Sequence, residues 1–472
     1  MRRIAAILAA AALIAAAAPS LADLPGGCLG EAPFVYWKDP VRIDTAAAGG
    51  EPVSVVAQDG SITVSAHAGT THLMKAPDAV PGATDFVVGY SNQTINWRST
   101  DEGQTWRRIG LAPPLDTGPH SATSTGFSDP DLAIDQAGRL YNTEINLPQV
   151  AVYSSPDDGQ SWPTANPIAS SGDRPWLAAN EPGEVFVLTN NFINRPLLRS
   201  QDGGLTFSIV NEDAPIDGKP ITDPSNPDDG LIGPSGTDAI SISDDDGATW
   251  KTYPGANLGP STQFFGTVAA DSAGNIYVAA AGGYSDRGNV DRNGSVTVAT
   301  FDRSSLRWSH VSTLDIPDGD ALWPWIVAGD EGRVAVAWLQ ELPGGPRERF
   351  AIYAAVSTNA HGKDPCGGSS TPEWAVSNAS GRAVHEGKIC LSGTACNLNI
   401  SSDRRLGDFI TINFDADGDI FIVSGDTTSE SPLGTRKPTA NPIFVGASVG
   451  TRLLEEPREL RPTGCLYGLV GC

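Results

Sequence analysis

The sequence Ser-Thr-Asp-Glu-Gly-Gln-Thr-Trp at Ser99–Trp106 decides the fold, because three further copies of its pattern follow along the chain. The copies are Ser-Pro-Asp-Asp-Gly-Gln-Ser-Trp at Ser155–Trp162, Ser-Gln-Asp-Gly-Gly-Leu-Thr-Phe at Ser200–Phe207 and Ser-Asp-Asp-Asp-Gly-Ala-Thr-Trp at Ser243–Trp250. An Asp side chain bonds backbone amides two residues on, and Gly adopts a positive φ that a Cβ resists. We therefore predict a structural turn between two strands in each copy. The turn-forming carboxylates are Asp101, Asp157, Asp202 and Asp245.

A second repeat precedes the first in each unit. It is an apolar strand, then Asp-x-x-Gly or a close variant, then another strand that ends in an aromatic residue. The clearest copies are Asp131–Tyr141 and Val268–Tyr277, and further copies are Trp176–Phe186 and Ile412–Phe421. This pattern predicts a two-strand hairpin closed by a Gly turn.

Together, the two repeats describe units of four antiparallel strands that recur at about 40 to 57 residues, the range of propeller blades. Seven strands that would begin a unit start near Glu51, Asp129, Asp173, Lys219, Phe264, Trp323 and Asp408. The fold predicted is all-β, a β-propeller with six or seven four-stranded blades, and seven is favoured. The run Phe34–Tyr36 is expected to complete the last blade.

Asp-containing turns at this spacing resemble those of the sialidase-like superfamily, the Asp-box or BNR-repeat β-propellers, over roughly residues 51–449. The resemblance implies a ligand site at the mouth of the central channel and exo-glycosidase chemistry on a glycan. The superfamily also includes non-enzymatic receptors and assembly factors. Sialidases place their first arginine in a Phe/Tyr-Arg-Ile-Pro motif. The nearest string here is Val41-Arg42-Ile43-Asp44, so no sialidase residue is carried over.

The chain begins with Met1-Arg2-Arg3 and an apolar run, and Ser20-Leu21-Ala22 follows. These are the parts of a bacterial secretory signal peptide. We therefore expect a signal peptide at residues 1–22 and a secreted or periplasmic mature protein. Residues 23–50 are expected to close the last blade. The propeller is expected at 51–450, with a Cys-bearing insertion at about 362–400. A Cys-bearing tail is expected at 451–472.

The chain has 6 cysteines, an even number that favours disulfides in an exported protein. Cys390 and Cys396 flank a short Gly-containing loop and form the best single pair. The partners of the other four stay open: Cys28, Cys366, Cys465 and Cys472. A zinc site is disfavoured because the spacings are irregular and no His stands at ligand spacing.

Acidic residues outnumber basic ones by 55 to 31. Phosphate binding depends on Lys and Arg, so nucleic-acid partners are excluded. No apolar run after the signal peptide has the length of a membrane helix, so we expect no membrane span. The mature protein is expected to be a monomer.

Candidate site residues lie where the inner strands begin, because those starts gather at the channel mouth. Carboxylates there can supply acid/base or nucleophilic chemistry, and indole faces can stack on sugar rings. The catalytic candidates are Asp173, Arg174, Asp131 and Asp408. The substrate-binding candidates are Trp176, Trp323, Trp325, Asp129, Arg405 and Glu51.

We expect a propeller that binds or hydrolyses a glycan at this mouth. The alternative is a non-catalytic extracellular scaffold that binds a protein or a small molecule. No cofactor is required by either hypothesis. A structural Ca²⁺ held by the carboxylates stays open, because acidic oxygens are its preferred ligands.

Overall fold

The protein is described here by a computed structural model that covers most of the chain. It describes residues 32–45, 49–67, 94–109, 128–146, 149–168, 172–191, 193–259, 261, 263, 265–285, 294–345, 347–363, 368–393, 396, 403–428 and 440–460. The expected signal peptide lies outside these ranges, as do Phe264 and four of the six cysteines. Within them, no helix is long and apolar enough to span a membrane.

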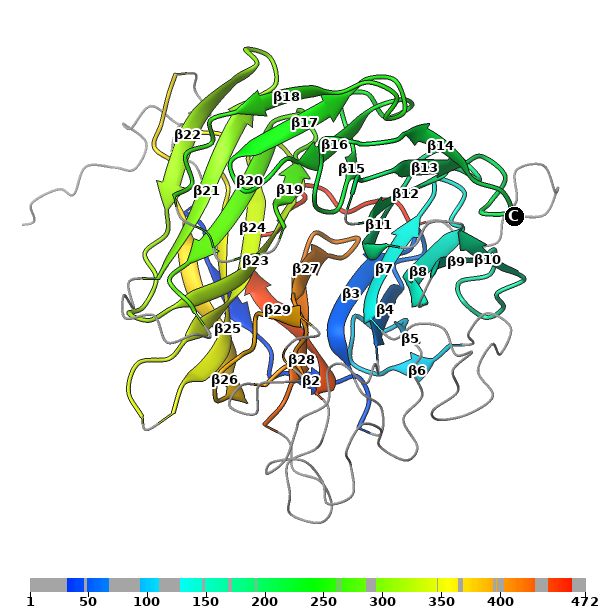
Figure 1. Cartoon of the computed structure of the whole chain (residues 1–472). Helices are drawn as coiled ribbons and strands as arrows, with labels where there is room; N and C mark the ends of the chain where they lie inside the picture. The colour runs from blue at the N-terminus through cyan, green and yellow to red at the C-terminus, as the bar shows by residue number, and fades with distance from the viewer. Residues whose placement is uncertain are drawn as a thin grey trace, which may run out of the picture.

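Seven antiparallel sheets stand around a central axis, and the first strand of each blade lies innermost (Figure 1). The prediction of a propeller with seven blades is therefore confirmed. Blade 1 consists of β3 (Gly50–Val56), β4 (Ile62–His67), β5 (Thr94–Ser99) and β6 (Arg107–Arg108). Blade 2 consists of β7 (Ser128–Ile134), β8 (Leu140–Asn146), β9 (Gln149–Ser155) and β10 (Thr164–Ile168). Blade 3 consists of β11 (Asp173–Ala179), β12 (Val185–Asn190), β13 (Leu197–Ser200) and β14 (Ser208–Asn211), and blade 4 of β15 (Ile221–Thr222), β16 (Leu231–Pro234), β17 (Ala239–Ser243) and β18 (Lys251–Pro254).

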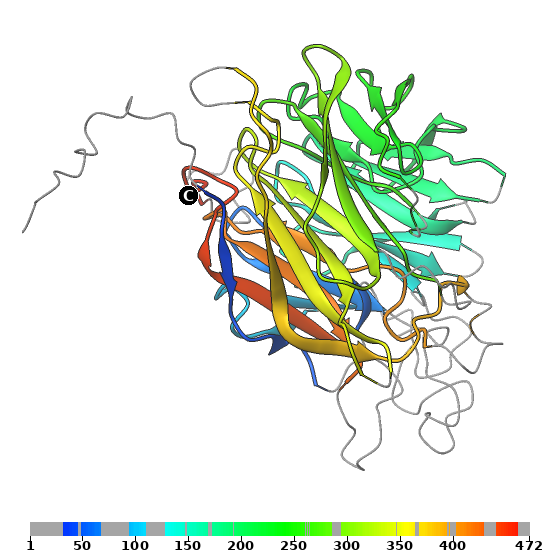
Figure 2. The same ribbon diagram turned by 90° about the vertical axis from the view of Figure 1, so that its left-hand side faces the viewer.

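Blades 5 to 7 complete the ring. Blade 5 consists of β19 (Thr267–Ala270), β20 (Ile276–Gly282), β21 (Ser295–Asp302) and β22 (Arg307–Thr313). Blade 6 consists of β23 (Ala321–Ala328), β24 (Val334–Glu341), β25 (Arg349–Ser357) and β26 (Ala375–Glu386). Blade 7 consists of β27 (Thr411–Phe414), β28 (Ile420–Asp426) and β29 (Asn441–Gly450) with β1 (Val35–Trp37) and β2 (Val41–Arg42). Both β1 and β2 pair with β29, beside which β1 lies in Figure 2. Segments from the two ends of the chain therefore share blade 7, which closes the ring.

The four Asp-containing turns connect the third strand of a blade to its outermost strand. In the first copy, Thr105 donates its amide (2.8 Å) and its hydroxyl (2.6 Å) to the two carboxylate oxygens of Asp101. The Gly103 amide donates to Ser99 Oγ at 2.9 Å. These hydrogen bonds, that of the Thr105 hydroxyl first, lower the pKa of Asp101, so the turn is stabilised by an ionised carboxylate.

The Asp of the Gly turn joins neighbouring blades. Oδ1 of Asp271 accepts amides of its own turn, from Ala273 at 3.1 Å and Asn275 at 2.9 Å. Its Oδ2 accepts the amide of Gly332 in blade 6 at 2.9 Å and the hydroxyl of Tyr277 at 2.7 Å. Asp135 makes the corresponding contacts with Gly183 and Tyr141. In the hairpins of blades 2 and 5, where the aromatic residue is Tyr, the turn Asp is thus also a contact between blades.

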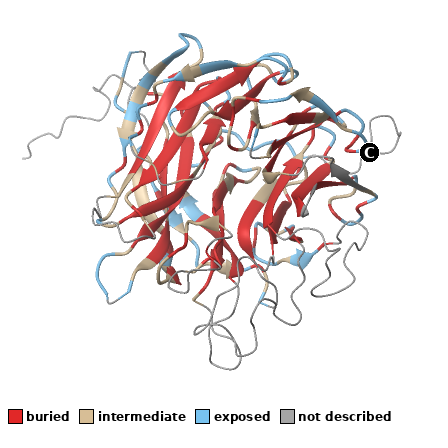
Figure 3. Ribbon diagram, in the orientation of Figure 1, coloured by how far each residue is buried: buried red, intermediate tan, exposed pale blue. Residues whose placement is uncertain are grey.

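Apolar side chains fill the space between adjacent sheets. Ile232 and Ile240 of blade 4 pack in one cluster with Val268 and Ile276 of blade 5. The innermost strands contain only buried and half-buried residues, whereas β22 alternates exposed and half-buried residues along its length (Figure 3). Each sheet therefore buries both faces, and burial of apolar surface between blades is the main stabilising contribution.

The region of the expected Cys-bearing insertion differs from the prediction. Ala375–Glu386, inside the 362–400 range, is β26, the outermost strand of blade 6, and pairs with β25. Two register shifts in that pairing interrupt the regular alternation that a strand prediction relies on. A disulfide joins Cys390 to Cys396 in the segment that leads from β26 toward blade 7.

We expect Asp271→Ala to lower the free energy of unfolding by about 3 kcal/mol or more, because it leaves buried amides in two blades without an acceptor. Urea denaturation at pH 7 measures this change. An exposed carboxylate in another loop, Asp315, provides the control variant Asp315→Ala. A loss below about 1 kcal/mol for Asp271→Ala would show that the carboxylate does not couple the blades.

Asp415 occupies the same turn position in blade 7, but Phe421 replaces the tyrosine there. Burial, together with the charges of Asp419 and Asp417, raises the pKa of Asp415 to about 6. The folded protein then binds this proton more tightly than the unfolded chain, so the ionised carboxylate is destabilising at pH 8. We expect Asp415→Asn to raise the free energy of unfolding at pH 8 by about 1 to 2 kcal/mol, a value reduced for partial solvent exposure. The gain should shrink as the pH falls through 6 toward 4. Denaturation curves at pH 8, 6 and 4 measure it, and a gain that does not depend on pH would contradict the assignment.

Candidate functional site at the channel mouth

Four inner strands open with the same strained element, a residue of positive φ followed by proline. The residues are Glu51 (φ 50°), Asp129 (φ 49°), Arg174 (φ 48°) and Trp323 (φ 53°). In each blade the pairing of the first two strands shifts register at this point. Positive φ is uncommon for residues other than Gly, and such strain is concentrated at functional sites. The bulge changes the direction in which each side chain points, because it breaks the alternation of a regular strand.

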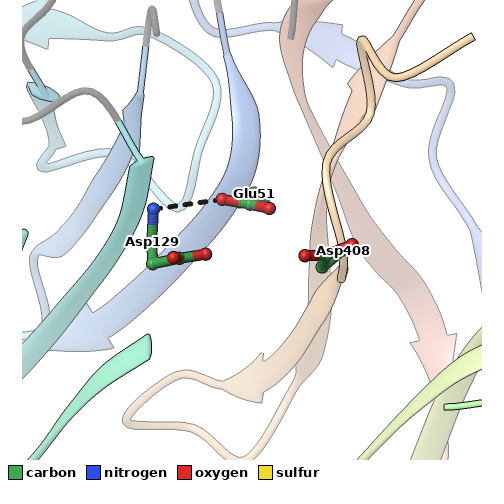
Figure 4. Close-up of side chains that lie close together, drawn as sticks. All are labelled: Glu51, Asp129 and Asp408. Carbon is green, nitrogen blue, oxygen red and sulfur yellow. Dashed lines mark hydrogen bonds between the residues drawn. The ribbon is translucent and has the colours of Figure 1, made fainter. Parts of the chain in front are cut away.

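Three carboxylates from blades 1, 2 and 7 meet at this end of the channel (Figure 4). Oxygens of Glu51, Asp129 and Asp408 all lie within 4.8 Å of one another, and all three residues are buried. Oε2 of Glu51 accepts the amide of Asp129 at 3.1 Å and lies 3.2 Å from His67 Nε2. A Cβ on Gly407, the residue before Asp408, would lie 2.1 Å from Glu51 Cγ, so only glycine fits there. This group of oxygens has the spacing of a cation site.

A guanidinium already supplies positive charge to the three carboxylates. Arg404 forms a bidentate ion pair with Asp408, with 2.5 Å between Nη2 and Oδ2, and Nη2 lies 3.8 Å from Glu51 Oε1. The attraction of Asp408 and Glu51 outweighs burial and raises the pKa of Arg404 above its ordinary value. The residues could hold Ca²⁺ by their chemistry, but Arg404 occupies the position from which an ion would neutralise them.

The proton affinities of two mouth carboxylates are raised. Burial, followed by the negative charges of Glu51, Asp173 and Asp408, raises the pKa of Asp129 well above its ordinary value. Burial also raises the pKa of Asp173, against the lowering effect of Arg174. The Asp173 side chain is 40% exposed, so it is the member of the group that faces solvent. Neighbouring carboxylates that cannot all ionise are typical of acid/base sites.

Arg174 connects these acids to the floor of the site. Its Nη2 lies 3.4 Å from Asp173 Oδ2, and its guanidinium lies over the Phe265 ring at 5.9 Å from the centroid. Asp217 lies at the start of blade 4. The charge of Arg174 lowers the pKa of Asp217, but burial is the larger effect and raises this pKa overall.

Four aromatic side chains from blades 3, 5, 6 and 7 form a cluster at the level below the carboxylates. Every pair among Trp176, Phe265, Trp325 and Phe409 is in ring contact, with centroids between 5.1 and 6.3 Å apart. Trp176 is only 2% exposed, so it packs in this cluster instead of presenting its face to a ligand. We call this cluster the aromatic floor.

Asp131 lies on the other side of the aromatic floor. It lines a cavity of 290 Å³ between the inner strands, together with Lys219 and Trp325. Lys219 Nζ lies 2.5 Å from Asp131 Oδ2, which also accepts the Leu177 amide at 2.7 Å. This buried ion pair joins blades 2, 3 and 4, and the structure does not bring Asp131 to the carboxylates of the mouth.

Two other predicted binding residues are buried. The side chain of Arg405 is 0% exposed and is paired with Asp403, with 2.6 Å between Nη2 and Oδ2. Trp323 is 3% exposed and packs with Tyr284 and Leu322 in the core near blades 5 to 7. Neither has a face available to a ligand in this structure, because Arg405 is enclosed with Asp403 and Trp323 is enclosed by its apolar neighbours.

The structure adds three residues that the sequence analysis did not select: Arg404, Asp217 and His67. Arg404 and Asp408 stand four residues apart, but this spacing indicates a pair only on a helix, and the segment here is a turn. Asp217 stands two residues before Lys219-Pro220. Lys219 also precedes a proline at the start of an inner strand, but it does not have a positive φ. His67 ends β4, where no motif marks it.

No family model matches the chain, and no curated protein matches it. Solved structures similar to it include the GH74 xyloglucanase from Xanthomonas campestris, with 14% identity and a TM-score of 0.46 over 85% of this chain. The chain spans only 55% of the length of that xyloglucanase. A mutant of the NanB sialidase from Streptococcus pneumoniae is 12% identical, with a TM-score of 0.42, over 88% of this chain and 70% of the sialidase. YCF48 bound to a peptide is 11% identical, with a TM-score of 0.36, over 69% of this chain and 94% of YCF48. At such identities the similarity concerns the fold alone and assigns no substrate to the mouth.

We expect Arg404→Ala to convert the three carboxylates into a Ca²⁺ site, because it removes the guanidinium that pairs with both Asp408 and Glu51. Differential scanning calorimetry with Ca²⁺ or with a chelator measures the effect. Ca²⁺ at a hundredfold excess over its Kd should stabilise the variant by about 2.7 kcal/mol and leave the wild-type protein unchanged. Arg174→Ala removes another mouth cation outside the ion pair and is the control. A wild-type melting temperature that falls on chelation would show that an ion and Arg404 occupy the site together.

Proposed function

We propose that this protein is an exported glycoside hydrolase that cleaves a glycan at the channel mouth, with Asp173 as the proton donor. The observation that carries the proposal is the raised pKa of Asp173 and Asp129 beside Asp408, which is paired with Arg404. Glycoside hydrolysis needs one protonated carboxyl group and one ionised carboxylate. Environments that separate the pKa values of neighbouring carboxyl groups supply that pair.

Asp173 suits the role of proton donor because it reaches solvent while the other carboxylates are buried. Asp129 is hydrogen-bonded to Asp173, so the two groups share the proton that Asp173 donates to the leaving oxygen. The water that attacks the sugar carbon then returns a proton to this pair. Asp408 contributes the negative charge of the ion pair with Arg404. That charge stabilises the positive charge that develops on the sugar ring in the transition state.

Arg174 has an electrostatic and positioning role. It lies beside Asp173, and its planar guanidinium over Phe265 presents N–H donors to ligand hydroxyls. The aromatic floor packs below these groups, and we expect a bound sugar to lie at the level of the carboxylates. Acidic residues outnumber basic ones at the mouth and would repel a negatively charged ligand. The mouth therefore favours a glycan that has no carboxylate of its own.

We expect Asp173→Asn to lower kcat by about 100-fold or more on any glycan that the wild-type protein cleaves, because it removes the transferable proton. A panel of glycosides and polysaccharides, followed by reducing-end release, identifies the substrate and measures kcat. Asp315→Asn changes an exposed loop carboxylate and should leave kcat unchanged. Full activity of a folded Asp173→Asn protein would contradict this role.

The pH profile tests the same assignment. A proton donor with a raised pKa keeps its proton to a higher pH, so activity should be lost only as the pH rises through that raised value. Arg174 lowers the pKa of Asp173, so Arg174→Ala should move the alkaline limb of the kcat/KM profile to higher pH. A limb that stays in place, or moves to lower pH, would assign the proton donor to another residue.

A binding function without hydrolysis uses the same groups and is the second candidate. It is favoured by the burial of Glu51 and Asp129, which are 0% and 5% exposed, because this burial leaves the partly exposed Asp173 as the carboxylate that can touch a ligand. Glycan binding that disappears in Asp173→Ala, with no turnover by the wild-type protein, would select this function. The absence of both on a broad panel would instead favour a scaffold that binds a protein.

A further inference from the structure

A second cavity, of 590 Å³, lies at one end of blade 6, outside the group of mouth carboxylates. We call it the blade-6 cleft. The hairpin between β24 and β25 forms one wall, and Gly387 with Lys388, which follow β26, forms another. Its volume falls in the range of sites that bind small organic ligands.

The blade-6 cleft opens on the same face of the propeller as the mouth. Ala321, which begins the inner strand β23, pairs with Gln340, and the neighbouring Glu341 pairs with Phe350. Arg349 in turn pairs with Glu386. This end of all four strands is therefore the end at which inner strands begin. Neighbouring strands lie about 4.8 Å apart, so the β24–β25 hairpin is about 5 to 10 Å farther from the channel axis than β23.

The segment next to the blade-6 cleft leads directly to the mouth. The carbonyl of Lys388 accepts the amide of Asp403 at 2.7 Å, and the following residue, Arg404, is paired with Asp408. On the other wall, Asp318 and Gly319 precede β23, and the Glu341 carboxylate accepts the amide of Asp320 at 3.3 Å. The same backbone segments thus shape the cleft and place the charged residues of the mouth.

The lining of the blade-6 cleft suits a ligand with many hydroxyl groups. Five charged residues of both signs line it: Asp318, Glu341, Arg347, Glu348 and Lys388. Gly319, Gly344, Gly345 and Gly387 leave the backbone open to a close approach. The mixed charge does not select a strongly charged ligand, and the cleft contains no aromatic residue for a flat apolar ring.

We propose that the blade-6 cleft is a distal subsite for the glycan, so that the ligand is an oligosaccharide of several linked units and not a terminal monosaccharide. This inference rests on the proposed glycan function of the mouth. One end of the oligosaccharide lies at Asp173 and Asp408, and its remote units bind in the cleft. Binding energy from remote units then positions the bond at the mouth.

Isothermal titration calorimetry with chito-, cello- and xylo-oligosaccharides of two and six units tests the proposal. In Asp173→Asn protein, which prevents turnover, we expect a six-unit probe to bind at least tenfold more tightly than its two-unit counterpart. Two cleft variants should abolish this difference: the double variant Arg347→Ala with Lys388→Ala, and Asp318→Trp, which fills the space. Both should leave binding of the two-unit probe within twofold of its original value.

A double variant of exposed basic residues on outer strands, Lys251→Ala with Arg307→Ala, makes the same change in charge and should keep the preference for the longer probe. Equal binding of short and long probes, or a loss of both in the cleft variants, would overturn the distal subsite while leaving the mouth function intact. If none of the probes binds, and the wild-type protein does not cleave these sugars, both proposals are overturned. The circular dichroism spectrum of each variant establishes that it is folded.

Discussion

The contact on which the ring depends is the carboxylate that serves two blades at once. In blades 2 and 5, one oxygen of the turn Asp completes its own Gly turn, and the other accepts an amide from the Gly turn of the following blade. A tyrosine hydroxyl from the same hairpin satisfies the second oxygen further. These two hairpins thereby help to determine where the hairpins of blades 3 and 6 lie, and the apolar faces of adjacent sheets are brought into contact. The positions of the inner strands of blades 3 and 6 depend on this coupling.

Because the inner strands are fixed, strain at their first residues can be tolerated. A positive φ before proline is unfavourable in isolation, and it persists only where the surrounding structure determines it. Glu51, Asp129 and Arg174 share this conformation, which directs three charged side chains from three blades to one end of the channel. Like charges so close together are costly. The cost is offset in part by Arg404, which pairs with Asp408, and by the protons that the raised pKa values of Asp129 and Asp173 retain.

The carboxylates near the aromatic floor have two environments with different chemistry. At the mouth, Glu51, Asp129 and Asp408 are buried side by side, and Asp173 beside them is partly exposed. Farther along the inner strands, Asp131 has a lysine and a backbone amide as partners, so its charge holds blades together. Two aspartates only two residues apart in one strand thus have separate roles. The blade-6 cleft adds a third environment on the mouth face, at a radius that a chain of sugar residues can reach.

The sequence by itself determined the fold, because Asp, Gly and aromatic residues at fixed offsets have one low-energy turn and recur at the spacing of blades. It also indicated Glu51, Asp129, Asp173, Arg174 and Asp408, since the starts of inner strands gather at one end of a propeller. It could not distinguish Arg404 from Arg405, although one pairs with Asp408 at the mouth and the other is buried against Asp403. Nor could it distinguish Asp131 from Asp129, or show that Trp176 and Trp323 are buried. Register shifts and contacts between distant blades decide which way each of these side chains points. Those contacts exist only once the ring has closed.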